Sequence, residues 1–396
     1  MISVAEAEAR IVAALRVTDA ETVSIADAAG RVLAADAIAK FDQPPAPVSS
    51  MDGYAVRAAD AVIAPSTLRV TGSSPAGHPF AGSVKPGEAV RIFTGGVVPN
   101  GADAIVIQEN AEASGDRVTI KSPAKHGQHI RKAGLDFAKG DTLANAGRRL
   151  TARDVSLLAA GDIAQVSVRR KPVIAFAATG DELSMPGEPR KSGGIVASSG
   201  YGLAAMISHW GGTARDLGIL PDTVEAVSAI AELAKDADLI VTLGGASVGD
   251  HDLVQKALGP KGFALDFWKI AMRPGKPLIF GKLGATPLLG LPGNPVSSLV
   301  CAMLFLRPAI AALLGESAKA ELLSAKLLRD LPANDARQDY LRARTEIRDG
   351  ELCVEAFAVQ DSSMLSILAK ANALIVRSPN APAAKAGDRV SILPLE

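Results

Sequence analysis

The sequence predicts a multidomain α/β plus β protein, and three observations support this prediction. The chain has 396 residues, which is enough for more than one domain at roughly 100–200 residues each. Apolar runs and helical patterns alternate from about residue 171 to 316, which is typical of a mostly parallel, three-layer α/β domain. Short strand-like runs separated by Gly and Pro occupy residues 48 to about 140 and 321–396.

The first 170 residues read as a small helical and β-rich region. Ser3 to Leu15 predicts a helix, with Ser3 as its cap and Glu6 completing a capping box. A proline-rich break at 43–47 follows, then the β-rich stretch, and a helical pattern returns at 150–161. The last segment, 321–396, predicts a small β-barrel or sandwich.

Within the α/β domain the expected strands and helices follow one another in chain order. We expect strands at 173–178, 214–220, 239–243, 265–270, 278–281 and 287–291, and helices at 199–210, 222–235, 252–258 and 295–313.

Composition excludes several classes of protein. Lys and Arg balance Asp and Glu at 42 each, so no nucleic-acid or membrane-surface attraction is expected. The longest apolar stretch, 299–314, is interrupted by Arg307 and Pro308, and we expect it to be too short to span a bilayer at about 20 residues. Cys301 and Cys353 sit in apolar settings and are expected to be buried and reduced, which favours a soluble, cytoplasmic protein. No paired-histidine zinc pattern and no nucleophile elbow is present.

Polar, Gly-rich segments follow five of the predicted strands of the α/β domain. Because the carboxyl ends of parallel strands share one edge, these segments should converge on one crevice. They supply the acids Asp181, Glu182, Asp222, Asp250 and Asp252 and the bases Lys269, Arg273 and Lys276. Acids beside bases predict a site for a phosphate and Mg²⁺.

Each segment alone allows a second interpretation. Residues 244–249 could present backbone N–H groups to an anion or form a tight turn. Asp250 and Asp252 could hold Mg²⁺ or cap the next helix. The polar turns of the first half, around Asp52, Thr94 and Arg131, are by themselves ordinary turns.

Nine motifs occur in the order found in one known family. They are GRVLAAD, SSMDGYAVR, TGGVVPNGADAIVIQE, IRKAGLD, TGDEL, GGASVGDHD, MRPGKP, GLPGNPVS and SSMLSILAKANAL. Over about residues 3–394 the chain resembles the molybdopterin molybdenumtransferases, the MoeA family. TGDEL and GGASVGDHD are shared with molybdopterin adenylyltransferases, whereas SSMDGYAVR and IRKAGLD are more particular to the transferases.

The resemblance implies a domain organisation and a homodimer. A discontinuous N-terminal domain would comprise 1–45 and 142–170, with a β-rich domain inserted at 46–141. The molybdopterin-binding α/β domain would be 171–316, and the C-terminal β-barrel 321–396. The active site would lie between the α/β domain of one subunit and the β-rich domain of its partner, which would supply Asp52, Thr94, Arg131 and Asp136.

The resemblance also implies the chemistry and the residues. Molybdate would be inserted into adenylylated molybdopterin while the phosphoanhydride is cleaved and AMP leaves. The implied Mg²⁺ ligands are Asp222, Asp250 and Asp252. The implied catalytic residues are Asp52, Thr94, Asp136, Glu182, Asp222 and Asp252. The implied substrate-binding residues are Arg131, Gly244, Gly245, Ser247, Gly249, Lys269, Arg273, Lys276, Pro292, Pro295, Arg342 and Ser366. A surface role is the alternative for Arg342.

Partners implied beyond the substrates are a molybdopterin adenylyltransferase and molybdoenzyme maturation proteins. The sequence departs from the family at Ser199, Leu135 and Ile367, where Asn, Glu and Ser are frequent. Two other functions remain open, a tungstate-inserting paralogue and a non-catalytic scaffold resembling the C-terminal region of gephyrin. The acids retained in the predicted crevice favour the enzyme.

Overall fold

The structure is a computed structural model. It describes residues 1–190, 192–245, 251–317 and 321–395, and only the backbone of residues 251 and 252. Its contacts divide the chain into two compact units. The first comprises residues 1–21, 30–34 and 168–396, and the second residues 22–29 and 35–167. The chain passes between the units within β1 (Ala20–Ser24), at residues 29–30 and 34–35, and within β12 (Gln165–Arg169).

The first unit contains a six-stranded sheet in the order β16-β13-β17-β21-β20-β18. The four strands from β16 to β21 are parallel, and β20 runs antiparallel to its neighbours β21 and β18. Their bounds are β13 (Val173–Thr179), β16 (Thr213–Leu220), β17 (Leu239–Leu243), β18 (Phe263–Lys269), β20 (Pro277–Leu283) and β21 (Thr286–Leu291). The predicted, mostly parallel sheet is confirmed.

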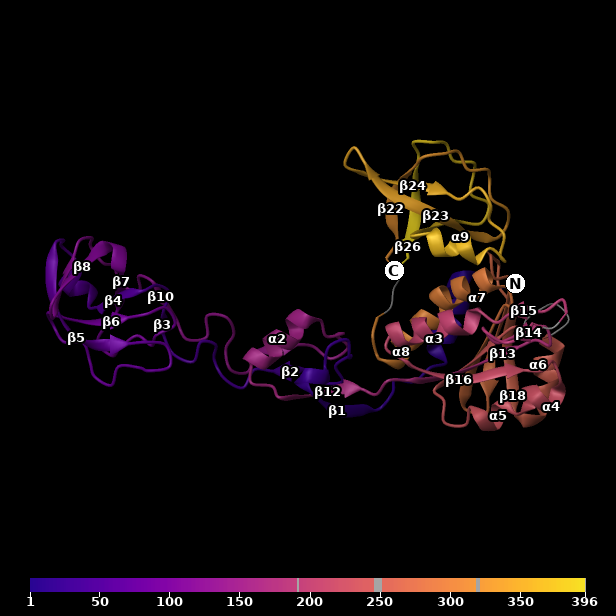
Figure 1. Cartoon of the computed structure of the whole chain (residues 1–396), viewed down its shortest axis with the longest axis horizontal. Helices are drawn as coiled ribbons and strands as arrows, with labels where there is room; N and C mark the ends of the chain where they lie inside the picture. The colour runs from indigo at the N-terminus through magenta and orange to yellow at the C-terminus, as the bar shows by residue number, and fades with distance from the viewer. Residues whose placement is uncertain (191, 246–250, 318–320, 396) are drawn as a thin grey trace. The chain divides into compact units, whose positions relative to one another are not determined.

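Helices cover both faces of this sheet, giving the predicted three layers (Figure 1). Successive residues of β13 alternate between two apolar cores, as the pleat of a strand requires: Phe176 faces one core and Ala177 the other. The first face packs against α1 (Val4–Ala13), α3 (Ser199–His209), α7 (Pro295–Cys301) and α8 (Arg307–Leu313). The second packs against α4 (Val224–Ser228), α5 (Ile230–Leu233) and α6 (His251–Leu258). The single helix predicted at 222–235 is wrong in this detail, since it is two short helices.

The helix at the start of the chain packs with the α/β unit. Ser3 caps α1 by accepting a hydrogen bond from the backbone N–H of Glu6. Val4, Ala7 and Ile11 lie in the same apolar core as the sheet. By its packing the helix therefore groups with the α/β unit, whereas the sequence analysis assigned it to the same domain as residues 142–170.

The apolar stretch after β21 forms a continuous helical segment, Pro295–Leu313, with a π-helical turn (η5) at Ala302–Leu306 between α7 and α8. Pro308 lacks an N–H, and its ring would clash with the carbonyl four residues earlier, so the chain relieves this conflict by widening the preceding turn. The helix predicted at 295–313 is confirmed, whereas the expectation that the apolar stretch is too short and too interrupted to span a bilayer is wrong by length and composition. By length and composition alone this helix could cross a membrane, but 83% of its most apolar window is buried inside the protein.

The C-terminal part of the first unit is a closed barrel of five strands, as predicted. The order β23-β24-β22-β26-β25 closes through pairing of β25 with β23. The bounds are β22 (Leu323–Leu327), β23 (Gln338–Arg348), β24 (Glu351–Ala356), β25 (Ala373–Arg377) and β26 (Arg389–Pro394), with α9 at Leu365–Lys370. The two-residue strand β19 (Met272–Arg273), from the α/β domain, pairs with β23 and joins the two domains. α9 contacts α7, as Figure 1 shows.

The second unit is built around a curled six-stranded sheet in the order β7-β4-β6-β5-β9-β8. Its strands are β4 (Gly53–Val56), β5 (Ser66–Ser74), β6 (Glu88–Ile92), β7 (Ala104–Ile107), β8 (Ala111–Ser114) and β9 (Arg117–Ile120). Short strands outside it are β2 (Ala37–Ile38), β3 (Val48–Ser49), β10 (Ile130–Arg131) and β11 (Thr142–Ala144), and its helix is α2 (Ala152–Ala160). Thr151 and Asp154 form a capping box at the start of α2. The β-rich character predicted for this part of the chain is confirmed.

Candidate active site

The carboxyl ends of the parallel strands meet at one edge of the sheet. The backbone N–H of Gly180, after β13, donates to the carbonyl of Leu220 at the end of β16, at 3.3 Å. The N–H of Gly244, after β17, donates to the carbonyl of Leu291 at the end of β21, at 3.1 Å. β18 is antiparallel to β20, which is antiparallel to β21, so the segment after β18 leaves from the same edge. The predicted convergence of the loops is therefore confirmed.

A cavity of about 640 Å³ opens at this edge, in the size range of small-molecule sites. Three predicted site residues, Glu182, Pro292 and Pro295, lie in its wall. Most of the remaining wall is apolar or carries hydroxyl groups: Ala178, Thr179, Leu183, Ile195, Val196, Ala197, Ser198, Ser199, Gly200, Leu243, Pro277, Gly293, Asn294, Ser297, Ser363 and Leu365. Ser363 and Leu365 belong to the C-terminal part of the chain, so two domains of the first unit build this cavity.

The glycine segment after β17 touches the end of β13. A Cβ at Gly244 would lie 2.8 Å from the carbonyl oxygen of Thr179, and the φ of Gly244 is +95°. Both features require glycine, and they let two loops of the site approach one another. Gly245 follows with a φ of +68°. Ser247, Gly249 and Asp250 lie outside the described residues, and Asp252 belongs to the start of α6 with its side chain outside the description.

Three of the predicted site acids, Asp181, Glu182 and Asp222, lie on two loops that touch. The backbone N–H of Asp222, after β16, donates to Oδ1 of Asp181, after β13, at 3.3 Å. Asp222 is exposed, and Glu182 is part of the cavity wall. Within residues 1–190, 192–245, 251–317 and 321–395 no three acidic, His or Cys side chains gather closely enough to hold a metal ion. Two of the three predicted Mg²⁺ ligands, Asp250 and Asp252, lie beyond the side chains that the structure describes.

The predicted basic residues at the end of β18 and after it differ in their contacts and exposure. The Nζ of Lys269 lies 3.5 Å from the centre of the Trp268 ring, which is a cation–π contact. Lys276 is exposed, and its neighbour Pro277 lines the cavity.

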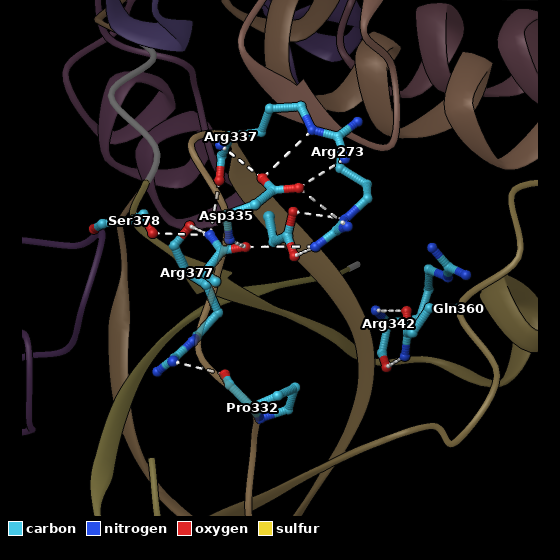
Figure 2. A network of polar contacts seen from close by, with 10 residues as sticks. Arg273, Pro332, Asp335, Arg337, Arg342, Gln360, Arg377 and Ser378 are labelled. Atoms are coloured by element: carbon cyan, nitrogen blue, oxygen red, sulfur yellow. Dashed lines mark hydrogen bonds and ion pairs between the residues drawn. The ribbon is translucent and has the colours of Figure 1, made fainter. Parts of the chain in front are cut away.

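Arg273 contacts carboxylates of the C-terminal domain. Its Nε donates to Oδ1 of Asp339 at 2.9 Å and its Nη2 to Oδ2 of the same carboxylate. Asp335 lies 3.5 Å from Nη1 (Figure 2). The hydrogen bond with Asp339 raises the pKa of Arg273 above its usual range. The structure thus adds a protein contact to a residue predicted to hold an anion.

Arg342 is buried on β23, with 1% of its surface exposed, so the surface alternative for this residue is wrong. Its Nη2 donates to the carbonyl of Asp361 at 3.0 Å, and its Nε has no hydrogen-bond partner in the described part of the chain. Burial lowers its pKa, and the charge of Asp361 opposes this shift. Figure 2 shows Gln360 beside Arg342: the backbone N–H of Arg342 donates to Oε1 of Gln360 at 2.9 Å, and Nε2 of Gln360 donates to the carbonyl of Arg342 at 3.0 Å. Ser366 is exposed on α9 and is not among the residues that line the cavity.

In the second unit the structure brings Asp52 and Thr94 together. Oδ1 of Asp52 accepts hydrogen bonds from the backbone N–H of Thr94 at 2.7 Å and from its hydroxyl at 2.9 Å. These two bonds, with a smaller contribution from the charge of Arg91, lower the pKa of Asp52. A carboxylate held in this way stays ionised and oriented.

Arg131 and Asp136 are exposed on neighbouring segments of the same unit. Arg131 pairs with Val48, on the strand that leads into Asp52. The backbone N–H of Asp136 donates to the carbonyl of Gln43 at 2.9 Å. Leu135, where the family often has an acid, is 63% exposed.

Sequence reasoning missed Ser363, Leu365 and Asp339. A signal existed for the first two, since they lie in the quoted motif SSMLSILAKANAL. Asp339 lies 66 residues from Arg273, and no motif connects them.

Models of three protein regions match the chain in order. They are the MoeA N-terminal region (domains I and II) over residues 2–161, a probable molybdopterin binding domain over 175–312, and the MoeA C-terminal region (domain IV) over 324–395. The three matches together leave only short segments of the chain uncovered.

Relatives and solved structures agree with these matches. The chain is 37% identical to the molybdopterin molybdenumtransferase of Haemophilus influenzae, over 95% of this chain and 94% of that protein. It is 35% identical to that of a Nostoc species, over 90% and 85% of the two chains. A crystal structure of a MoeA protein from Pyrococcus horikoshii superposes with a TM-score of 0.88 at 28% identity, covering all of both chains. On its sequence, its domains and its fold, the chain belongs to the MoeA family.

Proposed function

We propose that the chain is a molybdopterin molybdenumtransferase, which inserts molybdate into adenylylated molybdopterin with cleavage of the phosphoanhydride and release of AMP. One observation supports this more than any other. The cavity of about 640 Å³ opens at the edge where the parallel strands end, and its wall includes Leu243, which precedes the glycine segment, and Pro277, which follows the exposed Lys276. The names of the relatives, and the family of the α/β domain, support the same substrate class.

The lining of the cavity suits a flat heterocycle with polar edges. Apolar walls such as Leu243, Pro277 and Pro292 bury ring atoms, while Glu182 offers carboxylate oxygens to N–H groups. Ser363 and Ser297 add hydroxyls that can donate or accept. The dithiolene end and the phosphate would extend from the cavity toward Gly244 and Lys276.

The acids at the sheet edge suit a hard divalent cation. Asp222 is exposed, and its backbone N–H is bonded to Asp181, so two carboxylates stand at the edge of the sheet where the anhydride would lie. Mg²⁺ held by Asp222 together with Asp250 and Asp252 would supply positive charge next to the scissile phosphate. The chain itself supplies positioning: the backbone of Gly244 and Gly245 orients the phosphate, and Lys276 and Lys269 attract molybdate.

Residues of the second unit complete the proposal. Asp52, fixed in its ionised form by Thr94, and the exposed Arg131 and Asp136 suit a polar substrate. We infer that they act on the site of a partner copy in a homodimer. The two free, buried cysteines support a reducing compartment such as the cytoplasm.

Release of AMP from adenylylated molybdopterin, measured with Mg²⁺ and with or without molybdate, tests the proposal. The wild-type protein should release AMP in a molybdate-dependent way, and Asp222→Ala should abolish release. Asp236→Ala is the matched control, because Asp236 is an exposed acid before β17, at the opposite edge of the sheet, and its removal should leave the rate unchanged. A folded wild-type protein that releases no AMP with molybdate would refute the proposal, and the same assay with tungstate would then test the other oxyanion.

A further inference from the structure

The loop between β18 and β20 is held by two domains. Within it, the backbone N–H of Ile270 donates to the carbonyl of Lys276 at 3.0 Å, which closes the loop at its base. The carbonyl of Ala271 accepts from the N–H of Gln338, the first residue of β23, at 2.9 Å. We call residues 270–276 the anion loop, because it carries Arg273 and Lys276.

Beyond Ala271 the anion loop is tied to the C-terminal barrel by side chains. Both carboxylate oxygens of Asp339 accept from Arg273, in the forked geometry that fixes the plane of a guanidinium. The side chain of Asp339 is only 5% exposed, whereas that of Arg273 is 48% exposed. The buried carboxylate of Asp339 is therefore the fixed member of the pair, and it orients the more exposed side chain of Arg273.

Asp339 does not act alone. Asn334 accepts from Nη2 of Arg273 at 3.4 Å, and its amide donates to the carbonyls of Arg337 and Ser378 at 2.7 and 2.8 Å. Asp335, beside Arg273, also accepts from Arg337, which lowers the pKa of Asp335 to about 2. Figure 2 shows Arg273, Asp335 and Arg337 pointing toward one another. All of these partners belong to the C-terminal domain, so that domain holds the Arg273 side chain in one orientation.

The two positive charges of the anion loop, Arg273 and Lys276, differ in their surroundings. Two carboxylates surround Arg273, so its charge is largely compensated. Lys276 is exposed and makes no ion pair with any residue that the structure describes. Of the two, Lys276 is thus the cation left to meet an oxyanion, and Pro277, next to it, forms part of the cavity wall.

We propose that Asp339 is a positioning residue of the active site: by holding Arg273 it fixes the anion loop so that Lys276 meets molybdate. The inference rests on the proposed function for its substrate, and it assigns a role in that site to the C-terminal barrel. Its effect should appear as molybdate affinity rather than as maximal rate, because Asp339 itself touches no reacting atom.

Asp339→Asn gives a sharp test, because two explanations predict opposite signs. Removing a negative charge near an anion site should by itself improve molybdate binding. Loss of positioning should instead raise the molybdate concentration for half-maximal AMP release about tenfold, with the rate at saturating molybdate within about twofold of wild type. Asp339→Glu, which restores the carboxylate, should recover most of the loss. Arg273→Lys, which keeps the charge but cannot form the fork, should resemble Asp339→Asn.

A second acid–arginine pair provides the control for a general loss of stability. Asp154 is buried and paired with Arg148 at 2.8 Å in the second unit. Asp154→Asn should leave half-saturation by molybdate unchanged. An unchanged or lower half-saturating concentration in Asp339→Asn, or an equal rise in Asp154→Asn, would overturn the inference.

Hydrogen–deuterium exchange of peptides covering 270–277 separates this inference from the proposed function. Exchange should be faster in Asp339→Asn and in Arg273→Lys than in wild type, and unaltered in Asp154→Asn. Unaltered exchange in both loop variants would overturn the inference whatever the activity. Wild-type protein without molybdate-dependent AMP release would contradict the proposed function alone, since the exchange data would still report whether Asp339 fixes the loop.

Discussion

Replacing Gly275 by alanine should disturb the anion loop. A Cβ at this position would lie 2.3 Å from Sγ of Cys301, a distance that real Cβ atoms do not reach. Cys301 is fully buried on α7, so the sulfur has no open space into which to move. The φ of Gly275 is +104°, a region that side chains with L configuration rarely adopt.

The magnitude follows from these two effects. Left-handed backbone costs about 1–2 kcal/mol for a residue with a Cβ. Overpacking in a filled core adds typically about 1–3 kcal/mol. Gly284→Ala isolates the first effect, since its φ is +60° and a Cβ there would meet no atom within 4 Å. We therefore expect losses of about 1–2 kcal/mol for Gly284→Ala and about 2–5 kcal/mol for Gly275→Ala.

Denaturant unfolding followed by tryptophan fluorescence measures these losses. Both tryptophans of the chain, Trp210 and Trp268, lie in the first unit, so the signal reports the unit that contains the loop. In a Cys301→Ala background the clash with the sulfur is gone, and the closest remaining atom is Cε of the flexible Met272 side chain, at 3.2 Å, so Gly275→Ala should then be much milder and approach Gly284→Ala. The reasoning is refuted if Gly275→Ala is no more destabilising than Gly284→Ala, or if Cys301→Ala does not soften it.

Three further outcomes can be measured. Burial of Asp154 opposes its ionisation, but bonds from Arg148 and Thr151 outweigh this and lower its pKa from 3.8 to about 2. The ionised Asp154 should therefore add about 2 kcal/mol to the free energy of unfolding above about pH 4, and this contribution should disappear as the pH falls through about 2. In urea unfolding, lowering the pH should consequently destabilise Asp154→Asn less than wild type. Thr94→Val removes a hydroxyl bond that lowers the pKa of Asp52, so the acid limb of the AMP-release profile should move to higher pH, while Thr67→Val, on β5, should not move it. Sedimentation at micromolar concentration should show a dimer, and a monomer with full activity would contradict the shared site.

The regular part of the fold was predictable because its sequence is locally consistent. The strand Leu239–Leu243 is apolar except for Thr242 and is fully buried, as expected of a central parallel strand. The loops after such strands must share an edge, so the meeting of Asp181 and Asp222 followed from topology alone. The same reasoning placed Glu182 and Pro292 at one cavity.

What sequence reasoning could not supply depended on contacts between distant segments. Arg273 was expected to hold an anion because it is a base in a polar segment that follows a predicted strand, but it is bonded to a carboxylate 66 residues away. Arg342 was open to a surface interpretation because nothing local shows that the barrel closes around it. The helix at 295–313 was predictable from its apolar residues, but the π turn before Pro308 was not, because no sequence pattern indicates it.

Strand β23 has a consequence for exchanging domains between relatives. Asp339, which holds the anion loop, and Arg342, which holds the carbonyl of Asp361 before the cavity-lining Ser363, stand three residues apart on this strand. A chimera that receives the C-terminal domain of a relative would therefore keep both of these contacts or lose both together. A junction that inserts or deletes one residue within β23, and so shifts its pairing register by one, would turn the side chains beyond it to the opposite face of the barrel wall. The spacing of these two residues, rather than overall similarity of the barrel, is thus the quantity that a transplanted C-terminal domain must preserve.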